Sequence, residues 1–279
     1  MKRIVSTNGV VYYRSDIIPC IHGFSARIGG VSTEPHTKGL NLGLDRGDGR
    51  ETVIENLKLF SEALRIDAES IISVSQIHSD NIRTVSDEHR GEGYFKIETE
   101  PCDGYITNSD NITLGVRSAD CVPILLYAPE SEGFGGAVAA LHAGWRGTAL
   151  GIVRRAVEKL SFMGAQVGDI KAAIGPSIGP CCYCVKEDFY QSFRAAAGDA
   201  LTEGFVTPVG DKVWVADLKG ANREILYNSG LSLDNIDLCK ACTCCEPSEF
   251  YSHRYSKGQR GTMLSVISRQ HREGGSDKR

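Results

Sequence analysis

Apolar residues recur along the chain in short runs that are rich in β-branched side chains. Each run ends at glycine, proline, asparagine or aspartate, which is typical of strands buried in a sheet. The pattern predicts strands over residues 71–77, 112–116, 122–127, 137–141, 170–174, 212–215 and 263–267.

A second pattern, with apolar residues three and four apart, alternates with these runs and predicts helices. It predicts helices over residues 51–64 and 150–160, and a third that begins after Asp217. Asp217 is a suitable N-cap, and Gly164 and Gly230 follow two of these helices as stop signals. Helices that alternate with strands predict an α+β or α/β protein with helices covering the sheets.

No shift in composition divides the 279 residues. We therefore expect a single catalytic domain over residues 1–269, and a polar, disordered tail over 270–279. The formal net charge of -4 argues against nucleic acid or a membrane as a partner. The basic N-terminus has no apolar stretch after it, so it is not a signal peptide, and we expect a cytoplasmic protein.

Three polar residues stand at the ends of predicted strands, where a side chain can be partly buried beside an open loop. They are His78, Cys121 and His142. Two imidazoles and a thiolate form a common zinc site, in which water takes the fourth position and is activated at neutral pH. Taken singly, each residue has a simpler interpretation as a structural histidine or a small core cysteine.

Other functions fit parts of the same set of residues. Cys121 as nucleophile with His142 as base, and Asp120 nearby, would suit a cysteine hydrolase. Copper-dependent phenol oxidation is weaker, because it generally needs several coppers and the chain has only seven histidines. Copper would nevertheless bind such ligands tightly in vitro. A metal-stabilised binding protein is the non-enzyme alternative, and an open coordination position argues against it.

The segment after His142 carries a possible anion site. Gly144 and Gly147 flank Trp145 and Arg146 ahead of the predicted helix. A glycine-rich turn into a helix presents free N–H groups, and a guanidinium suits phosphate or carboxylate. A plain strand-to-helix turn in which Trp145 packs explains the segment equally well.

These segments resemble the signatures of the laccase-domain family, which is also called YfiH-like. The resemblance rests on eight segments, namely residues 22–32, 41–43, 76–78, 102–104, 119–123, 141–147, 174–183 and 250–254. Together they extend over nearly the whole chain. Arg117-Ser118 stands where the family often has Thr-Ala or Thr-Thr, His253 stands near a usual tyrosine, and Cys184 stands where the family often has an acidic residue.

The resemblance implies a single α+β domain of mixed β-sheets sandwiched between helical layers, with zinc bound by His78, Cys121 and His142. It also implies a purine nucleoside enzyme, a phosphorylase of adenosine, inosine and methylthioadenosine and an adenosine deaminase. Members were formerly described as copper-dependent polyphenol oxidases. The implied partners are a purine nucleoside and phosphate, and we expect a monomer or homodimer.

The reactions that the resemblance implies need substrate contacts, for which several residues are candidates. We expect Arg146 and Arg27 to hold phosphate, and Asn41 and Gln76 to hydrogen-bond sugar or base. Tyr183 could stack on the purine. Asp120 is expected either to orient a ligand histidine or to relay a proton.

The chain has ten cysteines, and most of them lie in two clusters, at residues 181–184 and 239–245. Without a secretion signal, we expect reduced thiols rather than disulfides. The second cluster is also compatible with a structural zinc site or an iron–sulfur cluster. Adjacent cysteines ligate one ion awkwardly, however, and the family carries Cys-Thr at the position of Cys242 without a second metal.

Overall fold

The computed structural model describes residues 1–271 of the chain. Within them lie two six-stranded sheets, one three-stranded sheet and six α-helices. The helices are α1 (Arg50–Leu64), α2 (Trp145–Leu150), α3 (Ile152–Phe162), α4 (Glu187–Ala197), α5 (Asp199–Phe205) and α6 (Leu218–Asn228).

The first sheet has the strand order β1-β2-β3-β15-β7-β4. Its strands are β1 (Lys2–Val5), β2 (Val11–Arg14), β3 (Cys20–Ser25), β15 (Met263–His271), β7 (Thr113–Ser118) and β4 (Ile71–Ile72). The second sheet has the order β14-β10-β8-β9-β6-β5. Its strands are β14 (Ile236–Leu238), β10 (Lys171–Ile174), β8 (Val122–Ala128), β9 (Ala137–Ala143), β6 (Gly104–Thr107) and β5 (Ile82–Thr84).

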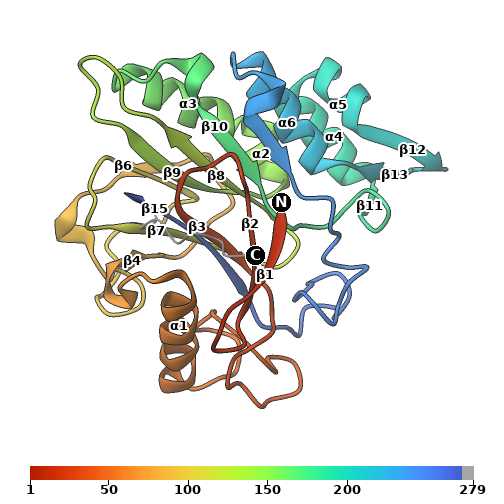
Figure 1. Cartoon of the computed structure of the whole chain (residues 1–279). Helices are drawn as coiled ribbons and strands as arrows, with labels where there is room; N and C mark the ends of the chain where they lie inside the picture. Colours follow the sequence, from red (N-terminus) through yellow and green to blue (C-terminus); the bar gives the residue numbers. More distant parts are fainter. Residues whose placement is uncertain (272–279) are drawn as a thin grey trace.

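The two large sheets pack face to face, and helices cover both outer faces (Figure 1). Phe24, Leu114 and Val116 of the first sheet share a buried cluster with Leu125 and Val138 of the second. This confirms the expected α+β arrangement of mixed sheets between helical layers. Among the described residues, every helix is too short or too polar to cross a lipid bilayer.

Helix α1 covers the outer face of the first sheet because its apolar residues recur on one side. Val53, Leu57 and Phe60 are fully buried against Ile71 and Leu264. Each such side chain contributes about 1.5–3 kcal/mol when it leaves water. The helix ends at Arg65, whose left-handed backbone (φ 59°) stops further helical hydrogen bonding.

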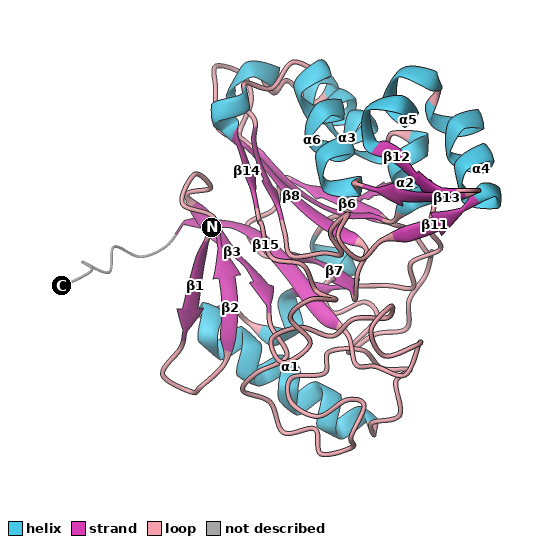
Figure 2. Ribbon diagram, turned by 90° about the vertical axis from the view of Figure 1, so that its right-hand side faces the viewer, coloured by secondary structure: helices cyan, strands magenta, loops and turns pink. Residues whose placement is uncertain are grey.

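Helices α2, α3 and α6 cover the outer face of the second sheet, and α4 and α5 pack beside the small third sheet (Figure 2). The third sheet has the order β11-β13-β12, with β11 (Cys184–Lys186), β13 (Val213–Ala216) and β12 (Val206–Gly210). Four short 3₁₀ helices lie at Ala68–Ser70, Asp87–His89, Val167–Asp169 and Leu233–Asn235.

Most predicted elements are present, but three differ from expectation. The strand predicted over 71–77 ends at Ile72, because Ser73 N–H bonds to Glu92 O (3.0 Å) and Val74 N–H to the Tyr105 hydroxyl (2.7 Å), outside any ladder. The helix predicted at 150–160 begins two residues later, as α3, because Gly151 (φ 77°) separates it from the short helix α2, which ends at Leu150.

The third difference lies at the C-terminal end. Strand β15 continues to His271, so residues 270 and 271, which we expected in the disordered tail, pair within the first sheet. Residues 272–279 of that expected tail lie outside the described residues.

Candidate metal centre

The structure brings His78, Cys121 and His142 together at one end of the second sheet. Their ligand atoms all lie within 4.8 Å of one another, and the Cys121 Sγ is 4.0 Å from the His78 Nε2. The two imidazole rings meet edge to face, with centroids 5.0 Å apart. Two nitrogens and one sulfur at this spacing match a zinc site with a fourth position left open.

Two neighbouring antiparallel strands deliver two of these ligands. His142 is the penultimate residue of β9 and is paired with Pro123 of β8, while Cys121 directly precedes β8. Because side chains alternate along a strand, His142 shares the face of β9 that carries Val138 and Ala140 between the two sheets. His142 therefore lies on the face of the second sheet that packs against the first.

Asp103 positions both histidines. It directly precedes β6, and its Oδ1 accepts a hydrogen bond from His142 Nδ1 (2.8 Å). The same carboxylate accepts the backbone N–H groups of His78 (3.0 Å) and Ser79 (2.6 Å). Burial disfavours the charged carboxyl, but the bonds from His142 and Ser79 outweigh it and lower the pKa of Asp103. Fixing Nδ1 as the donor leaves the Nε2 lone pair of His142 for a metal.

Sequence reasoning offered Asp120 for this orienting role, and the structure gives that role to Asp103. Asp120 instead accepts hydrogen bonds from the Thr243 hydroxyl (2.6 Å) and the Arg254 backbone N–H (2.6 Å). Its carboxylate therefore ties two distant loops to the residue before Cys121. The signal that could have found Asp103 was its place in the Cys102-Asp103-Gly104 motif, directly ahead of an apolar strand.

The backbone around the ligands is restricted. His78 (φ 59°) and Asp120 (φ 94°) both occupy the left-handed region that non-glycine residues rarely adopt. A methyl group on Gly144 would lie 3.0 Å from His78 Cδ2 and 3.3 Å from Cys121 Sγ. Glycine at this position therefore leaves the space in which the ligand atoms converge.

The electrostatics of the centre favour the form of cysteine that binds metal. Burial opposes ionisation of Cys121, but His142 and His78 lower the pKa of its thiol to about 6. Burial likewise opposes the charge on His142, whereas Cys121 and Asp103 raise its pKa to about 9. Thiolate is the metal-binding and nucleophilic form of cysteine, so the centre suits either a metal or a cysteine nucleophile.

A pocket of about 270 Å³ opens on this centre, and its charged lining is basic apart from Asp45. It is lined by Gly43, Leu44, Asp45, Arg46, Ser75, Gln76, His78, Arg117, Ser118, Ala119, Cys121, His142, Arg260 and Thr262. Three guanidinium-bearing residues, Arg46, Arg117 and Arg260, thus share a cavity with the three candidate metal ligands. Sequence reasoning missed this group because its members come from three separate segments.

The family described as multi-copper polyphenol oxidoreductase laccase matches residues 21–270. This range includes the candidate ligands and every residue that lines the pocket. The chain belongs to this laccase-domain family. The membership confirms the resemblance seen in the motifs.

Named relatives in the laccase-domain family are enzymes of purine nucleosides. Purine nucleoside phosphorylase YlmD of Bacillus subtilis (strain 168) is 36% identical over 250 residues, which cover 88% of this chain and 87% of the relative. Adenosine deaminase RL5, from an unknown prokaryotic organism, is 31% identical over 84% of this chain and 88% of its own length. The crystal structure of YlmD from Geobacillus stearothermophilus superposes with a TM-score of 0.83 at 32% identity, covering 94% of this chain and 96% of that chain.

Two of the residues expected to contact substrate help to build the pocket wall. Gln76 lines the pocket, but its amide is bound to the backbone of Arg117, with the N–H of Arg117 2.7 Å from Oε1 and its carbonyl 2.8 Å from Nε2. Asn41 is buried behind the wall and accepts the backbone N–H groups of Gly43 (3.0 Å) and Thr262 (2.9 Å). Both residues therefore position pocket-lining segments.

The two arginines expected to hold phosphate do not line this pocket. Arg27 donates to the carbonyls of Pro247 (2.8 Å) and Lys38 (3.2 Å). The guanidinium of Arg146 is exposed and stacks on the Trp145 ring at 4.2 Å. Arg146 belongs to α2, at whose N-terminus Gly144 stands, so it follows closely on His142.

Proposed function

We propose that the chain is a zinc-dependent purine nucleoside enzyme, which phosphorolyses adenosine, inosine and methylthioadenosine and deaminates adenosine. The observation that carries the proposal is a His78–Cys121–His142 centre that opens on a pocket lined by arginines. The named relatives support this substrate class. The proposal includes a reducing, cytoplasmic location, because the cysteines form no disulfide within residues 1–271.

The donor set fits zinc better than a multicopper arrangement. One thiolate and two imidazoles provide three ligands and leave one position for water, as in zinc hydrolases. Zinc held by these residues would supply a Lewis acid that lowers the pKa of a bound water toward about 7. Its protein ligands are held by Asp103, which fixes the tautomer of His142 and the backbone of His78. The family description names copper, which the same ligands would also bind tightly.

Deamination and phosphorolysis need different second reactants in the same pocket. In deamination, water must reach C6 of adenine. In phosphorolysis, phosphate must reach C1′ of the ribose while the purine leaves. The metal centre and the arginine-lined wall share one cavity. The water used in deamination and the phosphate used in phosphorolysis would therefore bind on neighbouring surfaces of the same pocket.

The pocket arginines are our first candidates for holding phosphate. Burial, and then the neighbouring Arg46, lower the pKa of Arg260 to about 10, so it remains charged at neutral pH. Its buried Nε has no hydrogen-bond partner within the described residues. An anion would satisfy this buried donor, which is costly to leave unpaired. Arg146 and Arg27, the candidates from sequence, remain to be compared with it.

A cysteine hydrolase is the second candidate, and one observation favours it. Cys121, His142 and Asp103 follow one another like a nucleophile, a base and the acid that orients the base. Such an enzyme needs one histidine beside the thiol, whereas His78 also approaches Cys121 Sγ, at 4.0 Å. The second imidazole is explained by a metal and has no role in the hydrolase.

Elemental analysis paired with a nucleoside panel tests the proposal. The wild type and the Cys121→Ala variant are each purified without added metal, loaded with zinc and desalted. The variant should hold about one zinc per chain less than the wild type. The wild type should consume adenosine and inosine, the latter only with phosphate present. Zinc content unchanged in Cys121→Ala, His78→Ala and His142→Ala would overturn the metal assignment. Metal-loaded protein without nucleoside turnover would overturn the substrate class and lead to labelling of the Cys121 thiol.

A further inference from the structure

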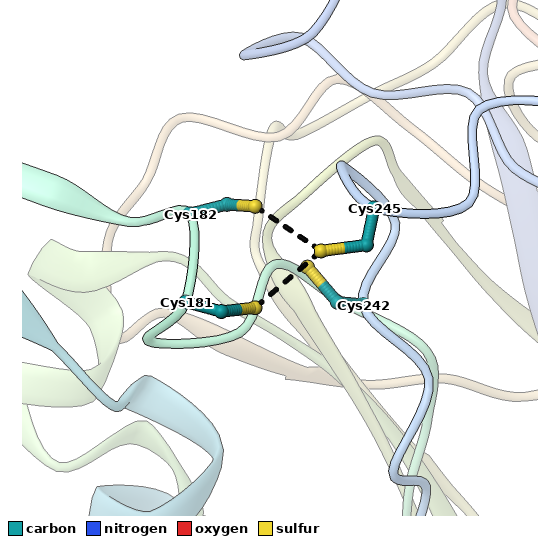
Figure 3. A group of neighbouring side chains, drawn as sticks. All are labelled: Cys181, Cys182, Cys242 and Cys245. Atoms are coloured by element: carbon teal, nitrogen blue, oxygen red, sulfur yellow. Dashed lines mark hydrogen bonds between the residues drawn. The ribbon is translucent and has the colours of Figure 1, made fainter.

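Four cysteines outside the His78–Cys121–His142 centre converge on one point (Figure 3). The Sγ atoms of Cys181, Cys182, Cys242 and Cys245 all lie within 4.8 Å of one another. The Cys245 Sγ is 3.6 Å from that of Cys181 and 3.3 Å from that of Cys182. Two loops that are far apart in sequence contribute two sulfurs each.

The spacing of these sulfurs is close to that of a tetrahedral thiolate site. A zinc–sulfur distance of about 2.3 Å places the ligand sulfurs about 3.8 Å apart. The two separations between the sulfurs, 3.6 and 3.3 Å, are slightly shorter than this edge. Both adjacent cysteines, Cys181 and Cys182, point toward Cys245, so their adjacency does not keep either sulfur away.

Each loop has a turn that presents its two sulfurs to the other loop. Cys242 and Cys245 have the C-x₂-C spacing of zinc knuckles, and Cys242 O accepts the backbone N–H groups of Cys245 and Glu246, each at 3.1 Å. In the other loop, Gly179 O accepts the N–H of Cys182 at 3.0 Å. The two turns are thus set by backbone hydrogen bonds independently of any metal.

Backbone contacts join the loops at the cluster. The Gly179 N–H donates to Cys242 Sγ (3.2 Å), as backbone amides often do to metal-bound thiolates. Thr243 N–H also donates to Ser177 O (3.2 Å). The guanidinium of Arg254 donates to the carbonyls of Cys182 (3.4 Å) and Cys184 (2.8 Å), which puts a cation against the backbone of the first loop.

We propose that Cys181, Cys182, Cys242 and Cys245 form a second metal site, a tetrathiolate that binds zinc or another thiophilic divalent cation. The protein fills all four positions, which makes the site structural rather than catalytic. Each thiol that ligates the metal gives its proton to solvent, so four thiolates and one divalent cation carry a net charge of about -2. Arg254 partly compensates this charge.

The site would brace the peptide that carries Cys121. Ile178 N–H, in the first loop, donates to Asp120 O (3.0 Å), and the Thr243 hydroxyl, in the second, donates to Asp120 Oδ1 (2.6 Å). A metal that crosslinks the loops therefore fixes two of the hydrogen-bond partners of Asp120, the residue before Cys121. The tetrathiolate would act on the His78–Cys121–His142 centre through this position and contact no substrate.

A disulfide is the competing use of the same thiols. Cys245 can bond to Cys181 or to Cys182 but not to both, which would leave two thiols without a role. Metal ligation uses all four. Thiol titration of anaerobically purified, denatured protein in the presence of a chelator separates the two, since nearly all ten thiols should react. A count that is short by a pair would overturn the proposal.

Zinc content gives the direct test. After loading with zinc and desalting, Cys242→Ser and Cys245→Ser should each hold about one zinc per chain less than the wild type. Cys184→Ser is the matched control, since its side chain is exposed and outside the cluster, and it should hold as much zinc as the wild type. Equal zinc in all four proteins would overturn the proposal.

Cobalt gives a second measurement that does not depend on whether these variants fold. The Cys121→Ala protein retains the four clustered cysteines, and titration with Co²⁺ should produce the intense thiolate-to-cobalt charge-transfer absorption of a tetrathiolate, saturating at about one equivalent. Absence of that absorption would overturn the proposal. Because Cys121 is already removed, the result is independent of the proposed nucleoside activity.

Discussion

At the residue scale, the most informative group is Asp103, which sequence reasoning did not place in the site. Its carboxylate bonds to the ring of His142 and to the backbone of His78 and Ser79. One buried charge therefore orients one ligand directly and another through the chain that carries it. His142 lies in a strand and His78 in a loop, so a shared hydrogen-bond acceptor fixes the positions of the two ligands relative to each other.

Asp103→Asn should weaken zinc binding at the His78–Cys121–His142 centre by about 10- to 100-fold. The amide cannot accept all of the N–H groups that the carboxylate accepts, and the tautomer of His142 is no longer fixed. Competition against a calibrated zinc chelator measures the affinity. Asp237→Asn is the control, because it alters a carboxylate that accepts a hydrogen bond from the Ser15 hydroxyl (2.6 Å). This variant should have the zinc affinity of the wild type. Equal affinity in both variants would contradict the role of Asp103.

Gly144→Ala tests the space between the ligands. Its backbone is ordinary (φ -65°), so the substitution adds no backbone strain, but the new methyl group would meet His78 and Cys121 at 3.0 and 3.3 Å. Overpacking of this kind costs about 1–3 kcal/mol, or about five- to a hundred-fold in zinc affinity.

Gly49→Ala is its matched control. Gly49 is also a helix N-cap with a similar backbone (φ -64°), and a methyl group there meets nothing within 4 Å. Zinc affinity should be unchanged in this variant. If both alanine variants bind zinc like the wild type, the ligand atoms do not converge as described.

At the element scale, the sequence predicted correctly those helix and strand boundaries that depend on interactions between residues close together in the chain. The apolar spacing located α1 to within one residue at its start, and Asp217 caps α6 through Gly220 N–H (3.0 Å) as expected. The strand predicted over 71–77 was wrong beyond Ile72, because its later N–H groups bond to Glu92 and Tyr105, which a local pattern cannot contain. The residues that leave the sheet early are those that lead to His78.

Asp217→Ala should lower the free energy of unfolding by about 0.5–2 kcal/mol, because an N–H in the first turn of α6 loses its acceptor. Denaturant unfolding followed by circular dichroism measures the change. Arg223→Ala, on the exposed face of the same helix, should change stability by less than about 0.5 kcal/mol. A loss in the control as large as in Asp217→Ala would show that helix propensity, not the cap, is being measured.

At the scale of the whole molecule, the pocket is assembled from segments that only the complete fold brings together. Residues 43–46, 75–78, 117–121 and 260–262 supply most of its lining. The motifs predicted the three candidate ligands, since each stands in a recognisable segment of the sequence. Arg46 and Arg260 have no such signal, because the sequence around them does not indicate that they lie beside the candidate metal ligands in the folded chain.

The last prediction concerns which guanidinium handles phosphate. Arg260 lines the pocket, has an unpaired buried Nε and lies within electrostatic reach of Cys121, whereas Arg146 is exposed and stacks on Trp145. A lost charge-assisted contact in the transition state costs about 2–4 kcal/mol, or about thirty- to a thousand-fold in rate. Arg260→Ala should therefore reduce phosphorolysis of inosine by this factor, and by more than it reduces deamination of adenosine, which needs no phosphate.

Arg146→Ala is the variant with which Arg260→Ala is compared. The value of kcat/KM is determined for both reactions in both variants, at saturating and at limiting phosphate. If Arg260 holds phosphate, Arg146→Ala should leave the ratio of the two activities near that of the wild type. A selective loss of phosphorolysis in Arg146→Ala alone would assign phosphate to the exposed turn that the sequence first indicated. Equal loss of both activities in Arg260→Ala would make Arg260 a general substrate clamp, because a phosphate ligand must spare the reaction that uses only water.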